Sequence, residues 1–203
     1  MKNYITEFIG TFFLVLAIGF SGDPFIIGVM LMVMVYMGGH ISGAHYNPAV
    51  SIAMIIRGML TKVEAIRYIL AQLLGAFFAV IFNYWVTGNI MEVNPSEIAP
   101  LLHVLVIEIL FTFILVLVIL NVATNSKTEG NSYYGIAIGS TVMVGAYIGG
   151  PISGGAYNPA VGIGPIFVDI IFGNGFSLSN MMLYFLAPII GGVLAAFLYR
   201  KLN

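Results

Sequence analysis

Two short segments of the chain carry the same residues with hydrogen-bonding chemistry. Asn47-Pro48-Ala49 lies within "GAHYNPAV" and Asn158-Pro159-Ala160 within "GGAYNPAV", about half the chain length apart. An Asn before a Pro can serve as the N-cap of a helix whose first residue is the Pro. The Asn side-chain amide can also donate hydrogen bonds to a passing oxygen atom. The pair therefore predicts a polar site built from two helix N-termini.

Two acidic residues and one histidine are the other candidates for chemistry. Glu7 and Glu108 interrupt apolar runs, where a carboxylate is costly unless it has partners. They could titrate in an acid/base or proton-coupling role, or they could brace the surrounding backbone. His45 lies two residues before Asn47 and is the best placed of the three histidines, since His40 and His103 fit packing or interface positions. No metal-ligand cluster, no nucleophile with a base and no cofactor motif is visible, so we expect neither an enzyme nor a metal site.

The composition defines the environment of the chain. Of its 203 residues, 60% are hydrophobic and only 7% are charged. Soluble domains carry roughly 25% charged residues, so this composition indicates an integral membrane protein that partners the lipid bilayer. The net charge is −1 and no basic stretch is present, which argues against a nucleic-acid partner. The absence of cysteine excludes disulfides and thiolate chemistry.

The apolar runs predict an all-α membrane protein. A membrane-spanning helix needs about 20 mostly apolar residues. We expect the first apolar run to be retained as a span and not cleaved as a signal peptide, because Glu7 interrupts it and a matching segment recurs later. Asp23-Pro24 is expected to begin the second span. The six predicted spans cover residues 4–20, 25–39, 64–86, 101–122, 133–149 and 179–200.

The basic residues predict the orientation of these spans. With a cytoplasmic N-terminus, all seven basic residues fall on the cytoplasmic side, and the outer loops contain none. This is the distribution that the positive-inside rule describes. We therefore expect a multi-pass protein of the cell membrane with both termini in the cytoplasm. The basic residues are Lys2, Arg57, Lys62, Arg67, Lys127, Arg200 and Lys201.

The chain contains an internal duplication. Three segments recur in the same order: residues 6–18 match 107–119, residues 38–50 match 149–161, and residues 68–79 match 184–195. Each half holds three spans, an odd number, so the second half enters the membrane from the opposite face. The halves are therefore predicted to be inverted repeats. We expect one channel-like domain over residues 1–203, with repeat one at 1–100 and repeat two at 101–203.

The apolar runs after the two Asn-Pro-Ala motifs are too short to cross a bilayer. "AVSIAMIIRG" and "AVGIGPIFVD" have about ten residues each, or about 15 Å of helix, half of a hydrocarbon core of about 30 Å. Irregular backbone at that depth survives only when it is buried or lines a wet cavity. We expect two re-entrant half-helices that meet at their N-termini, each contributing about +0.5 charge.

This pattern resembles the aquaporin (major intrinsic protein) family along nearly the whole chain. The resemblance rests on the doubled Asn-Pro-Ala, the "GGHISGAH" and "GGPISGG" lead-ins and the Glu in the first span of each half. It implies six spans, two half-helices, one pore per subunit and usually a homotetramer. It also implies that Glu7 and Glu108 accept hydrogen bonds from the re-entrant loops, and that His45 lines the inner vestibule.

The residues at the expected narrowest ring depart from the family pattern. The resemblance places Ile27, Ala146, Gly155 and Val161 at this selectivity constriction, where the family typically has an arginine directly after the second Asn-Pro-Ala. All four are apolar here and two are very small. The outer mouth is therefore expected to be wider and more apolar than in standard members, unless another side chain such as Tyr147 or Tyr157 fills the gap.

These observations favour a passive channel for water and small uncharged solutes of glycerol-like size. A secondary transporter of a small polar solute is the alternative, because inverted repeats with broken helices also build transporters. It would need an ion-binding or titrating group at the midplane. A membrane junction or scaffold protein with little conduction is the third possibility, although the short loops offer little adhesive surface.

Overall fold

The computed structural model describes the backbone of residues 1–203 and all side chains except those of Phe176 and Ser177. Within the described residues, six helices are long and apolar enough to span a bilayer, which confirms the expected all-α membrane architecture. Two shorter helices and two 3-10 turns complete the described elements. In chain order the elements are α1 (Lys2–Ser21), α2 (Pro24–Ser42), α3 (Pro48–Arg57), α4 (Lys62–Thr87), α5 (Leu101–Thr124), η1 (Ser126–Thr128), α6 (Tyr134–Ser153), α7 (Pro159–Phe172), η2 (Phe176–Asn180) and α8 (Met181–Leu202).

The helix ends follow from local sequence. Asp23 caps α2, since its Oδ1 accepts a hydrogen bond of 2.7 Å from the backbone N–H of Phe25. Gly43 and Gly154 end α2 and α6 in the left-handed conformation, with φ of 86° and 85°. Only glycine adopts this conformation without strain, so these positions turn the chain sharply into the two re-entrant segments. Both helices run further toward these glycines than hydropathy alone predicts.

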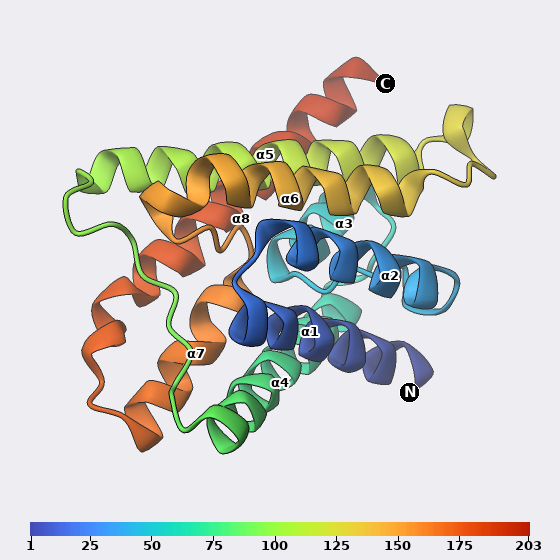
Figure 1. The fold of residues 1–203 in the computed structure, drawn as a ribbon. Helices are drawn as coiled ribbons and strands as arrows, with labels where there is room; N and C mark the ends of the chain where they lie inside the picture. Colours follow the sequence, from blue (N-terminus) through green and yellow to red (C-terminus); the bar gives the residue numbers. More distant parts are fainter.

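The helices pack in two matching sets (Figure 1). In the first repeat α1 packs against α2 and α4, and in the second α5 packs against α6 and α8. The α2 and α6 helices pack against each other across the repeats. Each short helix lies against the last long helix of the other repeat, α3 against α8 and α7 against α4. The two short helices therefore pack between the repeats.

Glycines allow the closest helix crossings. Where α2 and α6 cross, a Cβ added to Gly28 would lie 2.7 Å from the carbonyl oxygen of Gly139, and one added to Gly139 would overlap the Gly28 carbonyl. Gly75 of α4 lies against the Phe8 carbonyl, and Gly191 of α8 lies against the Ile109 carbonyl. Small residues permit such close approach of helices in membranes.

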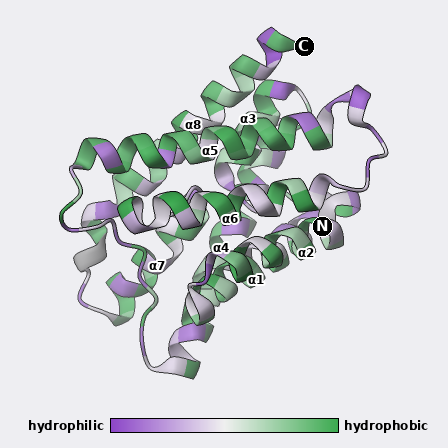
Figure 2. Ribbon diagram, turned by 45° about the horizontal axis from the view of Figure 1, so that its top comes forward, coloured by the Kyte–Doolittle hydropathy of each residue, from purple (hydrophilic) through white to green (hydrophobic). Residues whose placement is uncertain are grey.

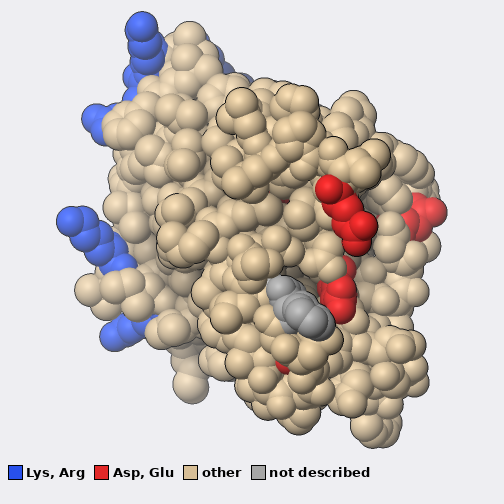
Figure 3. Space-filling view, turned by 90° about the vertical axis from the view of Figure 1, so that its left-hand side faces the viewer, with Lys and Arg blue, Asp and Glu red and all other residues tan. Residues whose placement is uncertain are grey.

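The surface has the distribution of a membrane protein. Hydrophobic residues run along the helices, and hydrophilic residues gather mainly at helix ends and in loops (Figure 2). Figure 3 shows the Lys and Arg side chains along one edge and the visible Asp and Glu side chains away from them. The end of the molecule that carries both termini is called the inner side below. The end that carries the α4–α5 segment, residues 88–100, is called the outer side.

Candidate functional site

The first re-entrant segment is held by a buried carboxylate on α1. Glu7 is fully buried and accepts hydrogen bonds from Ser42 Oγ at 2.6 Å, from the backbone N–H groups of His45 at 3.0 Å and Tyr46 at 2.6 Å, and from Gln72 Nε2 at 2.8 Å. These donors belong to α2, the segment and α4. The carboxylate therefore satisfies loop N–H groups that would otherwise be costly at this depth.

The second re-entrant segment repeats this arrangement with one donor fewer. Glu108 of α5 is also fully buried, and it accepts from Ser153 Oγ at 2.7 Å and from the N–H groups of Ala156 at 3.0 Å and Tyr157 at 2.7 Å. At the position that a glutamine side chain occupies in the first repeat, the second repeat has Pro188. Both carboxylates thus lie where they brace the segments.

A tyrosine next to each Asn adopts a strained conformation. Tyr46 and Tyr157 have φ of 49° and 48°, in the left-handed region that non-glycine residues rarely occupy. Their hydroxyls donate hydrogen bonds of 2.9 Å to the carbonyls of Met34 and Gly145, in the helix that precedes each segment. The glutamate, the tyrosine ring and the glycine turn together fix the backbone that delivers each Asn.

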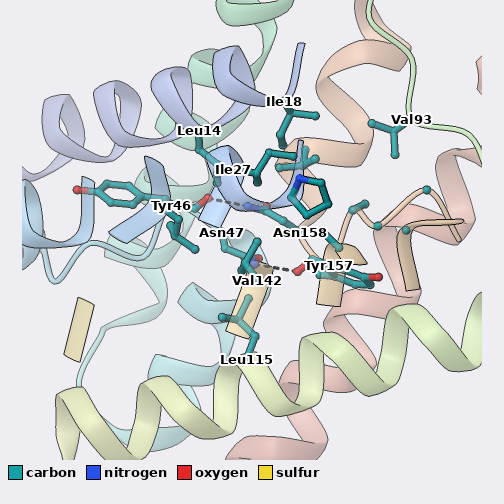
Figure 4. Close-up of a pocket in the computed structure, with 18 of the residues that line it drawn as sticks. Leu14, Ile18, Ile27, Tyr46, Asn47, Val93, Leu115, Val142, Tyr157 and Asn158 are labelled. Carbon is teal, nitrogen blue, oxygen red and sulfur yellow. Dashed lines mark hydrogen bonds between the residues drawn. The ribbon is translucent and has the colours of Figure 1, made fainter. Parts of the chain in front are cut away.

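The two Asn side chains link the two re-entrant segments by hydrogen bonds. Asn47 Nδ2 donates to the Tyr157 carbonyl at 3.0 Å, and Asn158 Nδ2 donates to the Tyr46 carbonyl at 2.8 Å. Figure 4 shows both amides in the cavity wall, with the two tyrosine rings pointing away in opposite directions. Each Asn Oδ1 accepts the N–H two residues later at 2.9 Å, and so caps its half-helix.

The electrostatics of this junction follow from the helix ends. The N-termini of α3 and α7 meet at the Asn pair, and each helix N-terminus carries about +0.5 charge. The α7 helix has 14 residues, more than the ten expected, and it continues through Pro165. The junction therefore combines a positive potential with fixed amide donors.

A cavity of about 510 Å³ passes this junction. Its wall is mostly apolar, with side chains from α1, α2, α5 and α6. The polar residues on the wall include Asn47, Asn158, His45 and Glu92. The ring of His45 is oriented by a contact of 3.1 Å between its Nδ1 and Ser51 Oγ.

The four residues of the expected constriction, Ile27, Ala146, Gly155 and Val161, all line this cavity. The two tyrosines considered as fillers of the gap do not serve that purpose. The side chain of Tyr147 is 55% exposed on the outside of α6, and the ring of Tyr157 points into α6.

Residues that sequence reasoning missed also line the outer part of the cavity. Met91 and Val93, from the 88–100 segment, are buried and line the cavity. The N–H of Ser96 donates to the Ile152 carbonyl at 3.0 Å and pins the segment onto the end of α6. No helical or strand periodicity marks this stretch, so only the folded chain reveals its position.

A second cavity of about 590 Å³ opens on the inner side. It lies among α2, α5, α6 and the loop after η1, and its wall includes His40, Arg57 and Glu129. The Arg57 guanidinium donates to the Thr124 carbonyl at 3.1 Å. His40 thus lines this cavity and is exposed there, whereas His103 is exposed at the start of α5.

Comparison with known proteins defines the class to which this arrangement belongs. It consists of two inverted sets of helices with paired half-helices, and a solved structure shares the fold. The X-ray structure of the aquaglyceroporin from Plasmodium falciparum matches with a TM-score of 0.81 and 25% identity, over 98% of this chain and 95% of that chain.

The sequence comparisons identify the family. The model of the family "Major intrinsic protein" matches residues 1–199. The chain is 35% identical to "Glycerol uptake facilitator protein-like 6" of Lactiplantibacillus plantarum, over 100% of this chain and 99% of the relative. It is 34% identical to "Nodulin-26" of Glycine max, over 98% of this chain and 77% of the relative. The chain belongs to the major intrinsic protein family, whose members are channels and not enzymes, and it is a passive membrane channel for water and small solutes.

Proposed function

We propose that solutes cross between Asn47 and Asn158, through the 510 Å³ cavity and on into the inner cavity. The observation that carries this proposal is the meeting of two capped half-helix N-termini in the wall of a deep cavity. Each Asn amide has two N–H donors, of which one is used to hold the other segment. The second is available to a solute oxygen, and the positive potential of the helix ends opposes cations.

The solute class follows from the outer part of the cavity. The side chains of Ile27, Ala146 and Val161 cannot form hydrogen bonds, and Gly155 has no side chain. With no arginine there, we propose that the channel admits uncharged solutes of glycerol size as well as water. The names of two similar proteins, a glycerol uptake facilitator-like protein and an aquaglyceroporin, support this class.

The same proposal includes the assembly and topology of the protein. We propose one channel domain made of repeats 1–100 and 101–203, both termini in the cytoplasm, residence in the cell membrane and a homotetramer with one pore per subunit. The single-sided distribution of the basic residues supports the topology, and family resemblance supports the tetramer.

A swelling assay with a cysteine block tests the path. The chain has no cysteine, so Ala146→Cys places a single thiol on the cavity wall. In proteoliposomes, lipid-permeant benzyl methanethiosulfonate should abolish water and glycerol flux through this variant, and a reductant should restore it. Ile148→Cys is the matched control, since Ile148 lies on the outer surface of the same helix and is 59% exposed. If the reagent inhibits both variants equally, the path lies elsewhere. The same conclusion follows if both variants are labelled and neither is inhibited.

A further inference from the structure

The lining of the pore is itself duplicated. Ile27 of α2 and Ile138 of α6 occupy equivalent positions of the two repeats, 111 residues apart, and Ile18 of α1 and Ile119 of α5 are equivalent at a separation of 101. Because the repeats are inverted, the image of an outer lining residue lies on the inner side of the Asn pair. Every ring of side chains on the outer side therefore has a counterpart on the inner side.

Two equivalent rings can be defined in this way. The outer ring consists of Ile18, Ile27, Ala146 and Gly155, and the inner ring consists of Ile119, Ile138, Val35 and Ala44, in matching order. The isoleucines are the same in both. Val35 is larger than Ala146 by its γ-methyl groups, and Ala44 is larger than Gly155 by its Cβ. The inner ring is thus the bulkier copy of the outer ring.

The cavities divide at the inner ring. All members of the outer ring lie on the wall of the 510 Å³ cavity, which continues past them to the Asn pair. The inner ring lines both that cavity and the 590 Å³ inner cavity, and its four members are the residues that the two linings share. The outer ring and the Asn pair therefore line one cavity, and the inner ring lies where this cavity adjoins the inner cavity.

The chemistry of the inner ring favours a constriction where the two cavities adjoin. Its four side chains are apolar, and each is less than a tenth exposed. Val35, Ile119 and Ile138 are β-branched residues in helices, so their χ1 angles have one strongly preferred rotamer. A rigid apolar constriction restricts passage by size and by expelling water.

We infer that the inner ring of Val35, Ala44, Ile119 and Ile138 is the size-limiting level of the pore, in place of the outer ring. The inference rests on the proposed path between Asn47 and Asn158. It assigns size selection to residues on the inner side, and leaves the outer ring as an entrance that admits solutes larger than the channel conducts.

Exchanging bulk between the two rings tests this assignment. Val35→Ala replaces Val35 by alanine, the residue found at the equivalent position of the outer ring, Ala146. Ala44→Gly removes a Cβ at a residue with φ of 51°, where glycine is the less strained residue, so this variant should fold at least as well as the parent. Ala146→Val is the matched control, because it makes the outer ring as bulky as the inner ring at the same equivalent position.

Fluxes of water, glycerol and the longer polyol erythritol are measured by light scattering in proteoliposomes. We expect Val35→Ala and Ala44→Gly each to raise the ratio of erythritol to glycerol flux several-fold, and Ala146→Val to change it little. Unchanged ratios in both inner-ring variants, or a several-fold fall in Ala146→Val alone, would overturn the inference. Failure of the proposed path has a different outcome, because the flux through Ala146→Cys would then survive labelling with benzyl methanethiosulfonate.

Discussion

Asn47 of the first repeat donates a hydrogen bond of 3.0 Å from its Nδ2 to the backbone carbonyl of Tyr157 in the second repeat. The equivalent bond from Asn158 to Tyr46 runs in the opposite direction at 2.8 Å. Each half-helix N-terminus is thus held by the loop that delivers the other. Substitutions at the two Asn residues should therefore be strongly non-additive, as is usual for residues in one network.

Asn158→Asp should open the channel to cations. The carboxylate keeps the acceptor that caps α7 but brings a full negative charge to a junction where the two helix ends supply about +1 in total. We expect potassium flux, measured with a potential-sensitive dye in proteoliposomes, to rise clearly above the wild-type level. Asn89→Asp is the control, because it adds the same charge at an exposed position beyond the outer end of α4, where solvent screens it. Wild-type cation exclusion in inserted Asn158→Asp protein would contradict an electrostatic role for the junction.

Glu7→Gln should destabilise the protein more than Glu108→Gln. Each change places an amide N–H₂ against groups that themselves donate, at a cost of about 1–3 kcal/mol or more. Glu7 has the extra donor Gln72 Nε2, so its replacement disrupts one more hydrogen bond. Thermal unfolding of purified protein in detergent measures the difference. Glu97→Gln, on the exposed outer segment, should leave the unfolding temperature unchanged. Equal stability of all three variants would show that the carboxylates do not brace the segments.

Gly139→Ala should destabilise the contact between the repeats. Its new Cβ would overlap the Gly28 carbonyl, so α2 and α6 would have to separate, which typically costs about 1–3 kcal/mol. Gly150→Ala in the same helix has no atom within 4 Å of the added Cβ and should be neutral or slightly stabilising. The measurement is the yield of folded protein and its unfolding temperature. A Gly139→Ala protein as stable as Gly150→Ala would mean that the crossing is looser than described.

Much of the fold could be predicted from the sequence because duplication and hydropathy are local patterns. Six apolar runs predicted six spans, and the confirmed short helices α3 and α7 begin at the Pro of each Asn-Pro pair. The exact ends of the helices were less predictable. Gly43 and Gly154 set the last turns of α2 and α6, and α7 extends beyond the expected run because the apolar residues Ile170, Ile171 and Phe172 continue it up to Gly173.

The outer mouth shows what the sequence could not predict. Met91 and Val93 lie in a stretch without periodicity, and their burial depends on contacts between the 88–100 segment and α6. The alternative in which Tyr147 or Tyr157 fills the gap is not what the structure shows, because the hydroxyl of Tyr157 donates to a carbonyl of α6 and Tyr147 faces outward. By contrast, the inner ring could have been found by aligning the two repeats and comparing equivalent lining positions.

Single-cysteine labelling should show that both termini lie in the cytoplasm. In the cysteine-free chain, Lys2→Cys should react with a membrane-impermeant maleimide only after the cells are permeabilised, whereas Glu97→Cys should react in intact cells. The expectation follows from the gathering of the basic residues on one side. The reverse labelling pattern would invert the proposed topology.

Val161→Arg should reduce glycerol flux more than water flux. Val161 is 2% exposed and lines the outer part of the cavity, so a longer, charged side chain there narrows the entrance. Glu92 lines the same cavity and offers a carboxylate to hold the guanidinium. The added charge is about as large as the positive charge of the two half-helix ends together, so exclusion of cations should also increase.

Val161→Leu is the control for Val161→Arg, because it adds bulk without charge or donors. Swelling rates in water and glycerol gradients measure both variants, and the unfolding temperature checks that the arginine is tolerated. A several-fold fall in glycerol flux with a smaller fall in water flux is expected for the arginine alone. If the wild-type channel already rejects glycerol, or if both variants reduce water and glycerol equally, the absence of an arginine does not set the width of the outer entrance.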